Sequence, residues 1–429
     1  MLCVSSPSSP PRSPLHCRSQ TQMTHITDCP VCGASSLSDF IKLPNLPIYC
    51  NLLWADRQEA KDCPKGDIEL AFCDQCGAVV NVVFDPQKLG YSQDYENSLH
   101  YSSRFQSYIE DLAERLIEQH DLHGKTIVEI GCGKGDFLAL LCEKGNNSGI
   151  GFDSSYVDRD EHAALGDRIK FIKDFYSEKY VEYQGDFVCC RQVLEHVQRP
   201  ADLLDPLRKT LEADQKETNQ KTAVFFEVPN ALYTIRNMMV WDVIYEHCTY
   251  FTPPSLSYAF TLAGYTVKET SEEFGGQFLS IEAQSAGDNQ TDIETDALTQ
   301  PLHKSIAQLA EEIASFKTRF ETQTQQWEER LSKLFEQGKR VVIWGSGSKG
   351  VTFLNLLTQG SQIEYAVDIN PRKQGKFIPG TGQPIVSPDY VADRPADVVI
   401  VMNPLYKEEI RDTLAQMGLA PEILTTESA

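Results

Sequence analysis

The chain has 429 residues, more than one hydrophobic core usually organises, so we expect two or three domains. Its formal net charge of −22 repels phosphate backbones. This excludes a dedicated nucleic-acid binder but allows a small anionic substrate at a local basic cluster. No apolar run approaches the roughly 18 residues that a membrane span needs, so no membrane partner is expected either.

Residues 1–25 are predicted to be a disordered leader, with a transit peptide as the alternative. They are rich in Ser, Pro and Arg and lack the apolar core of a secretory signal. The remaining chain has its cysteines in two CxxC pairs and as singles within strand-like segments. This pattern favours a reducing compartment over disulfides, and we predict a cytoplasmic location.

Residues 26–85 are predicted to be a zinc-binding domain. They contain two matching CxxC-Gly knuckles, in which the glycine permits a tight turn and two thiolates point at one ion. The gap between the knuckles exceeds the usual spacing, and Cys50 and Cys63 within it are spare candidates. A closed site of four thiolates leaves no position for water, so a structural zinc is expected at Cys29, Cys32, Cys73 and Cys76.

Residues 86–285 are predicted to be a catalytic α/β domain. A helical pattern runs from Ser103 to Gln119, and strand-like and helix-like segments then alternate, as in a doubly wound parallel sheet. Seven strand candidates, the last two close together, resemble the seven-stranded, Rossmann-like sheet of class I methyltransferases. They are TIVEI, SGIGFD, IKFI, DFVCC, AVFFEV, YTVKET and FLSIEA.

The rest of the chain predicts a linker and a third domain. Residues 286–300 are polar and acidic, which indicates a linker. Residues 301–429 are expected to form a second Rossmann-like α/β domain. It opens with a long helical pattern from about Leu302 to Gln337, and a βαβ unit follows at RVVIWGSGSKG.

The strand TIVEI leads into a glycine-rich turn that can bring backbone N–H groups and a helix N-terminus against a ligand. The turn alone is weak evidence, because dinucleotide enzymes use similar ones. The run VEIGCGKGDFL, however, resembles motif I of class I methyltransferases. The resemblance predicts that S-adenosylmethionine is the cofactor and that it binds at Glu129, Gly131, Cys132, Gly133 and Gly135.

Further positions are expected to line the same cofactor pocket. Asp153 ends the second strand, where its carboxylate can accept hydrogen bonds from both ribose hydroxyls. Asp174 follows the third strand near the expected adenine amino group, and Phe175 can pack on the ring. Each acid is otherwise a helix cap or a loop charge. The segment RQVLEHV resembles the vLEHv segment beside the sulfonium, which adds Arg191 and Gln192, while His196 either shares this role or packs.

A long insertion after the fifth strand contains WDVIYEHCTYF, from Trp241 to Phe251. Ligands bind at the carboxyl ends of the strands in an open α/β sheet, so we expect this insertion to lie over the transferring methyl. Methyl transfer to a poor nucleophile needs a proton removed. A histidine steered by an adjacent carboxylate and tyrosine suits that step.

Over residues 28–423 the chain resembles the three-domain C-methyltransferases of deoxysugar-nucleotide biosynthesis. Its most specific match is the C-terminal run DINPRKQGKFIPGTGQPI. The resemblance implies that His247 removes a proton next to a keto group and that the enolate carbon attacks the methyl. Glu246 would partner this base, with the hydroxyl of Tyr245 or Tyr250 at the developing oxyanion.

The chain departs from the family pattern at two places in the expected substrate pocket. Tyr245 lies two residues before His247 rather than three, and the family segment GGS-x-R-V reads GGQFLS at 275–280. The two departures leave the identity of the acceptor atom undecided. The alternative to a C-methyltransferase is an O- or N-methyltransferase that acts on a sugar or a related polar metabolite.

The resemblance also implies a nucleotide-sugar substrate, whose diphosphate needs cations that the overall charge does not supply. We expect a basic cluster of the C-terminal domain to supply them, with cleft residues from the tyrosine-rich connector and the end of the fifth strand. Ordinary surface or packing positions are the alternative. The candidates are Tyr101, Ser103, Asn230, Lys349, Arg372, Lys373 and Lys376.

Two functions of other classes are the rivals. The run GSGSKG at 345–350 matches GxGxxG after a strand, with Asp368 near the distance of a ribose contact, which would fit an NAD-binding oxidoreductase. A zinc-bearing scaffold without catalysis is the other. The intact glycine turn and Asp153 argue against it, because a scaffold needs neither.

Overall fold

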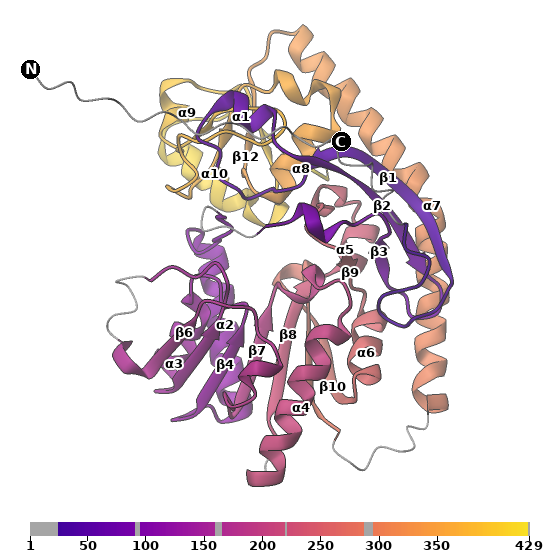
Figure 1. The fold of residues 1–429 in the computed structure, drawn as a ribbon. Coiled ribbons are helices and arrows are strands. Elements are labelled where there is room, and N and C mark those ends of the chain that lie inside the picture. The colour runs from indigo at the N-terminus through magenta and orange to yellow at the C-terminus, as the bar shows by residue number, and fades with distance from the viewer. Residues whose placement is uncertain (1–24, 91–94, 159–164, 219–220, 287–294, 428–429) are drawn as a thin grey trace, which may run out of the picture.

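The computed structural model describes residues 25–90, 95–158, 165–218, 221–286 and 295–427. The predicted leader lies outside these ranges except for His25, as does most of the predicted linker. The described strands form three sheets, of four, seven and five strands. In Figure 1 the seven-stranded sheet lies below the five-stranded one, and the long strands of the four-stranded sheet curve along one side.

The N-terminal sheet has the order β1-β2-β3-β9. Strand β1 (Leu37–Pro47) pairs antiparallel with β2 (Lys65–Cys73), and β2 pairs with β3 (Val79–Asn81). The fourth strand, β9 (Thr249–Tyr250), comes from far along the chain and pairs antiparallel with β3. Residues just after His247 therefore complete the sheet of the cysteine-rich domain.

The central sheet confirms the predicted fold class, because each of the seven predicted strands is present. Its order is β10-β11-β8-β7-β4-β5-β6, and β11 alone among these strands runs antiparallel to its neighbours. The strands are β4 (Thr126–Ile130), β5 (Ser148–Phe152), β6 (Ile169–Ile172), β7 (Phe187–Arg191), β8 (Ala223–Pro229), β10 (Tyr265–Glu273) and β11 (Phe278–Ser285).

Helices cover both faces of this sheet, so its strands are apolar on both sides. Neighbouring strand residues point to opposite faces: Phe225 packs into one layer and Phe226 into the other. Burying an aromatic ring of this size contributes about 2–3 kcal/mol relative to exposure. The layers are α2 (Ser103–His120) with α3 (Asp136–Lys144), and α4 (Ala201–Thr218) with α6 (Pro253–Leu262).

The C-terminal sheet is parallel with the order β14-β13-β12-β15-β16, which matches the first five strands of the Rossmann order 3-2-1-4-5-6. This also confirms the prediction. Its strands are β12 (Val341–Trp344), β13 (Ala366–Val367), β14 (Ile385–Val386), β15 (Val398–Val401) and β16 (Glu422–Thr425), and its helices are α8 (Ser348–Leu356), α9 (Tyr390–Asp393) and α10 (Lys407–Gln416).

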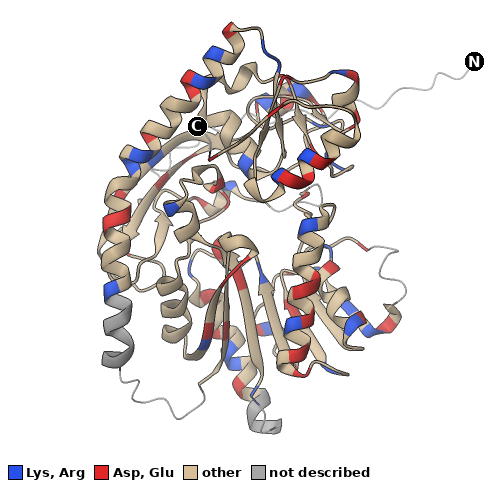
Figure 2. Ribbon diagram, turned by 180° about the vertical axis from the view of Figure 1, so that it is seen from behind, with Lys and Arg blue, Asp and Glu red and all other residues tan. Residues whose placement is uncertain are grey.

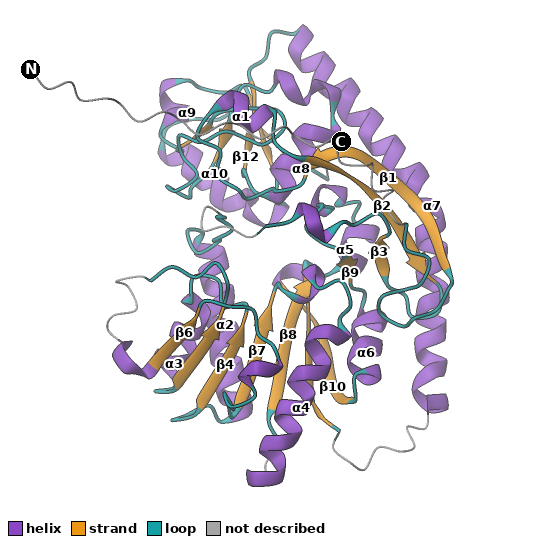
Figure 3. Ribbon diagram, viewed as in Figure 1, coloured by secondary structure: helices purple, strands orange, loops and turns teal. Residues whose placement is uncertain are grey.

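Helix α7 (Thr295–Glu336) runs along the outside of the molecule (Figure 3). It begins inside the predicted linker, because TDALTQ contains no glycine or proline that would end it. Its buried Trp327 meets Phe353 of the C-terminal domain edge-on at 5.1 Å. Its Arg319 donates to the Ile235 carbonyl at 3.1 Å. One hydrophobic core thus joins the N-terminal sheet, the insertion, α7 and the C-terminal domain.

Short elements complete the fold. No helix of the described residues is both long and apolar enough to cross a bilayer. Acidic and basic residues are interspersed along the ribbon of the described residues (Figure 2). The short helices are α1 (Arg57–Lys61) and α5 (Ala231–Arg236), with 3-10 turns at Pro86–Lys88, Glu178–Tyr180, Leu194–His196, Val240–Asp242, Phe274–Gly276, Thr358–Gln362 and Pro404–Tyr406.

Candidate active site and cysteine cluster

The four predicted metal ligands form one cluster. The Sγ atoms of Cys29 and Cys76 lie 3.7 Å apart, and those of Cys32 and Cys73 lie 3.6 Å apart. A tetrahedral ion bonded to four sulfurs at 2.3 Å spaces them about 3.8 Å apart, whereas a disulfide needs about 2.05 Å. The glycine after each knuckle has a left-handed backbone, with φ of 76° and 78°. The cluster therefore has the spacing of a four-thiolate metal site and not of two disulfides.

The glycine-rich turn lies between β4 and α3. Gly131 has φ of 70°, and a Cβ added there would lie 2.1 Å from Val193 Cγ2, so only glycine fits. The N–H groups of Gly131 and Cys132 donate to the Phe152 carbonyl at 2.7 and 3.1 Å. Gly135 caps the N-terminus of α3. The turn is thus held against β5 by its own backbone and against the turn after β7 by close packing.

Two acids flank this turn. Asp153 Oδ2 accepts from the Gly133 N–H at 2.9 Å, and its Oδ1 accepts from the N–H of Ser155 at 2.7 Å. Glu129 is buried, and its Oε2 has no hydrogen-bond partner among the described residues. Burial raises the pKa of Glu129 to about 8. A ligand that brings a positive charge beside Glu129 would stabilise its carboxylate form and lower this pKa.

Asp174 and Phe175 lie at the carboxyl end of β6. Asp174 accepts hydrogen bonds from Lys179, from the Tyr180 hydroxyl at 2.7 Å and from the Phe175 N–H at 2.8 Å. The hydrogen bond from Lys179 is the main reason that its pKa falls to about 2. The Phe175 ring is 63% exposed. Asp174 is therefore tied to its own loop, and Phe175 lies where it can meet a ligand.

Arg191 and Gln192 belong to a buried polar network at the ends of β7 and β8. Arg191 Nη2 lies 3.0 Å from Glu227 Oε1, and Gln192 Nε2 donates to the same oxygen at 3.1 Å. The Tyr108 hydroxyl of α2 donates to the other Glu227 oxygen. The Arg191 guanidinium also stacks on the Phe137 ring, 4.4 Å from its centroid. Both predicted residues thus belong to a buried network at the carboxyl end of the sheet, which is built on Glu227, an acid that the motif did not indicate.

The tyrosine-rich connector passes the same end of the sheet. His100 Nε2 lies 3.6 Å from Asp136 Oδ2, at the start of α3. Tyr101 is 40% exposed. Ser103 begins α2, and its N–H donates to Glu409 of the C-terminal domain at 3.3 Å. The connector is therefore beside the glycine turn, and both Tyr101 and Ser103 are exposed there.

His247 lies against the turn that follows β7. Its ring centroid is 4.9 Å from that of His196, and ligand atoms of Glu195, His196 and His247 all lie within 4.8 Å of one another. Burial, then the charge of His196 and then that of Lys349 lower the pKa of His247 well below its usual value. Its imidazole is therefore neutral at neutral pH, which is the form that accepts a proton.

Glu195 and His196 support this histidine. His196 Nδ1 lies 2.9 Å from the Glu246 carbonyl, which can only accept, so the ring proton is on Nδ1 and Nε2 faces Glu195. Burial lowers the pKa of His196 to about 4 and raises that of Glu195 to about 8. The 3.9 Å between Glu195 Oε1 and His196 Nε2 exceeds the about 3.4 Å between ligands of a tetrahedral ion. This distance is too long for a tetrahedral ion and also for a direct hydrogen bond between the two side chains.

Glu246 points to the N-terminal domain. Its Oε2 accepts from the Cys50 N–H at 3.0 Å, and its Oε1 lacks a partner among the described residues. Burial raises its pKa to about 7, and a hydrogen bond with Tyr95 partly offsets this effect. Tyr95 also lies 3.4 Å from Asn51 Nδ2. These polar residues are linked to His247 through Glu246, the residue that precedes it in the chain.

The two predicted oxyanion tyrosines have backbone partners. The Tyr245 hydroxyl accepts from the Asp85 N–H at 3.1 Å, and its ring stacks on Phe84 inside the N-terminal domain. The Tyr250 hydroxyl donates to the Ile244 carbonyl at 2.8 Å. The structure brings the Tyr250 ring to 5.7 Å from His247 but directs both hydroxyls to the backbone.

The predicted basic residues do not form one cluster. Lys349 Nζ pairs with Asp242 Oδ1 at 2.7 Å and, through its charge, acts on His247. Lys373 is buried and donates to Asn51 Oδ1 at 3.3 Å. Arg372 lies 3.7 Å from Glu96, while Lys376 lines a shallow surface groove beside β14. Of these four residues only Lys349 acts on His247, and Lys373 is linked to Glu246 through Asn51 and Tyr95.

Asn230 has a structural task. Its Oδ1 accepts from the Leu232 N–H at 3.1 Å and so caps α5, while its Nδ2 donates to the Gly276 carbonyl at 2.9 Å. Its side chain is buried. The residue therefore holds the start of the insertion to the turn between β10 and β11.

Two family profiles match adjoining parts of the chain. A family profile described as "Methyltransferase domain" matches residues 101–270, and one described as "C-methyltransferase C-terminal domain" matches residues 273–420. The C-methyltransferase NovU of Streptomyces niveus is 25% identical over 400 residues, 90% of this chain and 92% of that protein. This chain is an S-adenosylmethionine-dependent methyltransferase that carries a C-methyltransferase C-terminal domain.

Shorter similarities accompany this match. A tRNA U34 carboxymethyltransferase of Sulfurovum sp. (strain NBC37-1) is 31% identical over 121 residues, 27% of this chain and 39% of that protein. Among solved structures, the 1,6-didemethyltoxoflavin-N1-methyltransferase of Burkholderia thailandensis is 15% identical. It covers 43% of this chain and 81% of its own, with a TM-score of 0.32.

The second glycine turn of this methyltransferase also has an acid that accepts hydrogen bonds from the neighbouring backbone. Asp368 Oδ2 accepts from the Ser346 N–H at 3.0 Å and from its hydroxyl, and Asp368 Oδ1 accepts from the Asn370 N–H at 2.9 Å. Only 9% of Asp368 is exposed. Asp153 is bonded within the chain in the same way, so Asp368 differs from it only in being buried more deeply.

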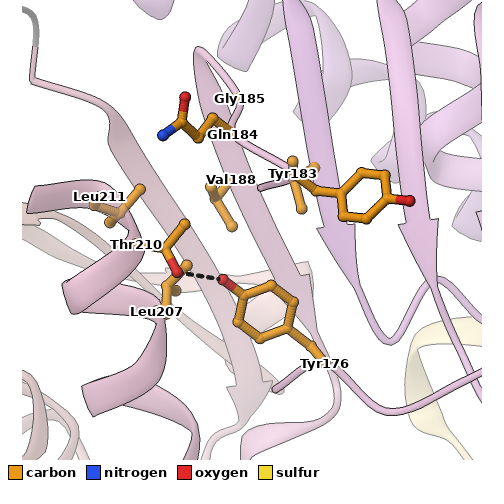
Figure 4. Close-up of a pocket in the computed structure, with 9 residues that line it drawn as sticks. Tyr176, Tyr183, Gln184, Gly185, Val188, Leu207, Thr210 and Leu211 are labelled. Atoms are coloured by element: carbon orange, nitrogen blue, oxygen red, sulfur yellow. Dashed lines mark hydrogen bonds between the residues drawn. The ribbon is translucent and has the colours of Figure 1, made fainter. Parts of the chain in front are cut away.

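A cavity under the methyltransferase sheet is not a ligand site. Figure 4 shows its lining, where the Tyr176 hydroxyl donates to Thr210 Oγ1 at 3.1 Å. Its volume of about 10 Å³ is that of a single water. It borders Gly185, before the amino end of β7, whereas the glycine turn follows the carboxyl end of β4.

Sequence reasoning missed Tyr95 and Glu195. Tyr95 lies in the same tyrosine-rich connector as Tyr101, and only the fold distinguishes the tyrosine that meets Glu246. Glu195 was visible in the vLEHv segment beside His196. A buried carboxyl at the end of a central strand is a signal for function, but burial is not readable from the motif.

Proposed function

We propose that this methyltransferase moves a methyl group from S-adenosylmethionine to the carbon next to a keto group of a nucleotide-linked deoxysugar, with His247 as the base. The observation that carries the proposal is the setting of His247. A neutral imidazole lies between the turn after β7 and Lys349 of the C-terminal domain, in the segment that joins all three domains.

The glycine turn would hold the methyl donor. The donor's positive amino group fits the buried, partly unpartnered carboxyl of Glu129, and Asp153 has the position of a ribose acceptor at the end of β5. Phe175 and Tyr101 are exposed aromatic residues in the segments after β6 and before α2. When bound, the donor supplies a methyl group on a sulfonium sulfur.

His247 would take the proton from the acceptor carbon. The electron pair of the broken C–H bond becomes an enolate, and the enolate carbon then forms the new bond to the methyl group. His196 and Glu195 adjoin the ring and can pass the proton onward. The hydroxyls of Tyr245 and Tyr250 have backbone partners, and that of Tyr95 bonds to Asn51 and Glu246, so an oxyanion contact from any of the three would have to displace such a partner.

The substrate diphosphate would lie at the N-terminus of α8. A Cβ added to Gly347, its N-cap, would lie 3.7 Å from Lys373 Nζ, and Lys349 occupies the first turn. Helix N-termini and lysines both favour a phosphate group. Binding of the anion would also offset the charge of Lys349 and raise the pKa of His247, which makes the imidazole a stronger base in the complex.

We also propose that Cys29, Cys32, Cys73 and Cys76 bind a structural zinc ion. The sulfur separations of 3.6 and 3.7 Å support this, because they leave four bonds of ordinary Zn–S length and no open position. Elemental mass spectrometry of the purified protein should find one zinc per chain, and Cys73→Ser should lower the zinc content.

Deuterium exchange tests the assignment of the base. In D₂O without the methyl donor, the enzyme should wash deuterium into the carbon next to the ketone of a nucleoside diphosphate keto-deoxysugar, detected by NMR. His247→Ala should abolish the exchange, while His123→Ala, which changes an exposed histidine, should leave it intact.

Two results would contradict the proposal. Deuterium exchange that persists in His247→Ala would contradict the assignment of His247 as the base. Methyl transfer to oxygen or nitrogen, without deuterium exchange at carbon, would favour an O- or N-methyltransferase. Calorimetric titration with S-adenosylmethionine should give the same affinity in both variants, so that loss of exchange reports on the base and not on the fold.

A further inference from the structure

The segment that carries His247 is part of the cysteine-rich domain's sheet. Strand β9 begins two residues after His247, and its pairs with β3 are Tyr250 with Val79 and Thr249 with Val80. The Asn81 N–H adds a bond to the Cys248 carbonyl at 3.0 Å. A two-residue strand has few bonds with which to define its register.

A slip in this register would move the base. One residue of slip displaces a strand by about 3.4 Å and turns each side chain to the opposite face. A displacement of about 1 Å near a reacting atom costs roughly 100-fold in rate. Something beyond two backbone pairs is therefore needed to hold β9 in place.

Thr252 supplies a second attachment, to the metal knuckle itself. Its Oγ1 donates to the Gly77 carbonyl at 2.9 Å, and its side chain is fully buried. Gly77 follows Cys76, and its own N–H donates to the Cys73 carbonyl at 2.9 Å. The hydroxyl of Thr252 thus ties the chain just beyond β9 to the turn that positions two of the four thiolates.

On its other side the segment meets the methyltransferase domain. The Cys248 N–H donates to the Glu195 carbonyl at 2.9 Å, and His196 Nδ1 donates to the Glu246 carbonyl. The segment therefore bridges the knuckle and the turn after β7. Its position relative to the methyl donor depends on both attachments.

We propose that Thr252 is a positioning residue, which fixes His247 by locking β9 to the cysteine knuckle through Gly77. This inference rests on the proposed role of His247 as the base. It assigns to the cysteine cluster a catalytic consequence in addition to its structural one: loss of the ion would loosen Gly77 and release the segment.

Three variants separate this role from that of a helix cap. Thr252 Oγ1 also accepts from the Ser255 N–H at 3.3 Å, and Ser255 Oγ accepts from the Thr252 N–H at 2.9 Å, so both residues cap α6. Thr252→Val removes the bond to Gly77 and the cap. Ser255→Ala weakens the cap alone, and Thr252→Ser keeps both bonds.

For Thr252→Val we expect kcat with a nucleoside diphosphate keto-deoxysugar to fall about 10- to 100-fold, with KM for S-adenosylmethionine within about twofold. Thr252→Ser should restore kcat, and Ser255→Ala should stay near wild type. Hydrogen–deuterium exchange by mass spectrometry gives a readout without substrate: residues 244–251 should exchange faster in Thr252→Val and in chelator-treated wild-type protein, but not in Ser255→Ala.

Equal effects of Thr252→Val and Ser255→Ala would overturn the inference, as would unchanged exchange of residues 244–251 in Thr252→Val. The proposed function fails separately, if His247→Ala keeps its activity. Zinc content measured on each variant shows whether the knuckle itself is intact, and a faster-exchanging segment with full zinc would support the role of the hydroxyl directly.

Discussion

Gly131→Ala should damage the methyltransferase more than Gly133→Ala, although both glycines belong to the same motif. Both have left-handed backbones, with φ of 70° and 57°, which costs an ordinary residue about 1–2 kcal/mol. Only at Gly131 does the new methyl group meet an obstacle, since it would lie 2.1 Å from Val193 Cγ2, whereas at Gly133 nothing lies within 4 Å.

The size of the difference follows from this contact. Valine is stiff about χ1, so Val193 cannot simply turn away, and overpacking costs about 1–3 kcal/mol. We expect a loss in the free energy of unfolding of about 2–5 kcal/mol for Gly131→Ala and about 1–2 kcal/mol for Gly133→Ala. Because Val193 precedes the Glu195–His196 turn, Gly131→Ala should also weaken donor binding.

Urea unfolding of the donor-free protein measures the first quantity, and calorimetric titration with S-adenosylmethionine measures the second. The shared left-handed strain cancels in the comparison of the two variants. Equal losses in both would refute the reasoning, because they would show that the turn and the segment after β7 do not constrain each other.

Three further predictions follow from the charges and thiolates. Burial raises the pKa of Glu195 from 4.5 to about 8. The neutral carboxyl therefore contributes fully to stability below about pH 4.5, and this contribution is lost as the pH rises to 8. In Glu195→Gln, the free energy of unfolding measured with urea should fall less over this pH range. The positive charge of Lys349 lowers the pKa of His247, so Lys349→Ala should move the acidic limb of the kcat/KM profile to higher pH, whereas Lys376→Ala should not move it. Cys73→Ser should speed hydrogen exchange in β3 and β9 together, and exchange confined to β3 would contradict the shared sheet.

The methyltransferase fold was predictable because its signals are local. Each buried strand is a short apolar run, and TIVEI with its glycine turn places the first strand and helix without any distant contact. The cysteine knuckles are equally local, and the Sγ atoms meet with the spacing that the motif predicts. The start of α7 was missed because polar, acidic residues suit a linker and an exposed helix equally well.

The direction of the insertion's side chains was not predictable. Tyr245 and His247 are near neighbours in the chain, yet Tyr245 packs on Phe84 while His247 meets His196. This division depends on the pairing of β9 with β3, which joins residues far apart in the sequence. Pattern rules carry no information on such a contact.

The basic residues show the same limit. Lys373 and Lys376 are three positions apart in one motif, but only Lys373 is buried against Asn51. Lys376 faces a groove on the outer edge of the C-terminal sheet. A charge count finds such residues, whereas the packing of two domains decides which of them reach the site.

The most direct test of the account is a crystal structure with S-adenosylhomocysteine and a nucleoside diphosphate keto-deoxysugar. We expect the donor's sulfur to lie over the glycine turn at 131–135, and the acceptor carbon to lie between that sulfur and the His247 ring. A sulfur at that turn with His247 directed away from the acceptor would contradict the central claim, as would a donor bound at residues 345–350 instead.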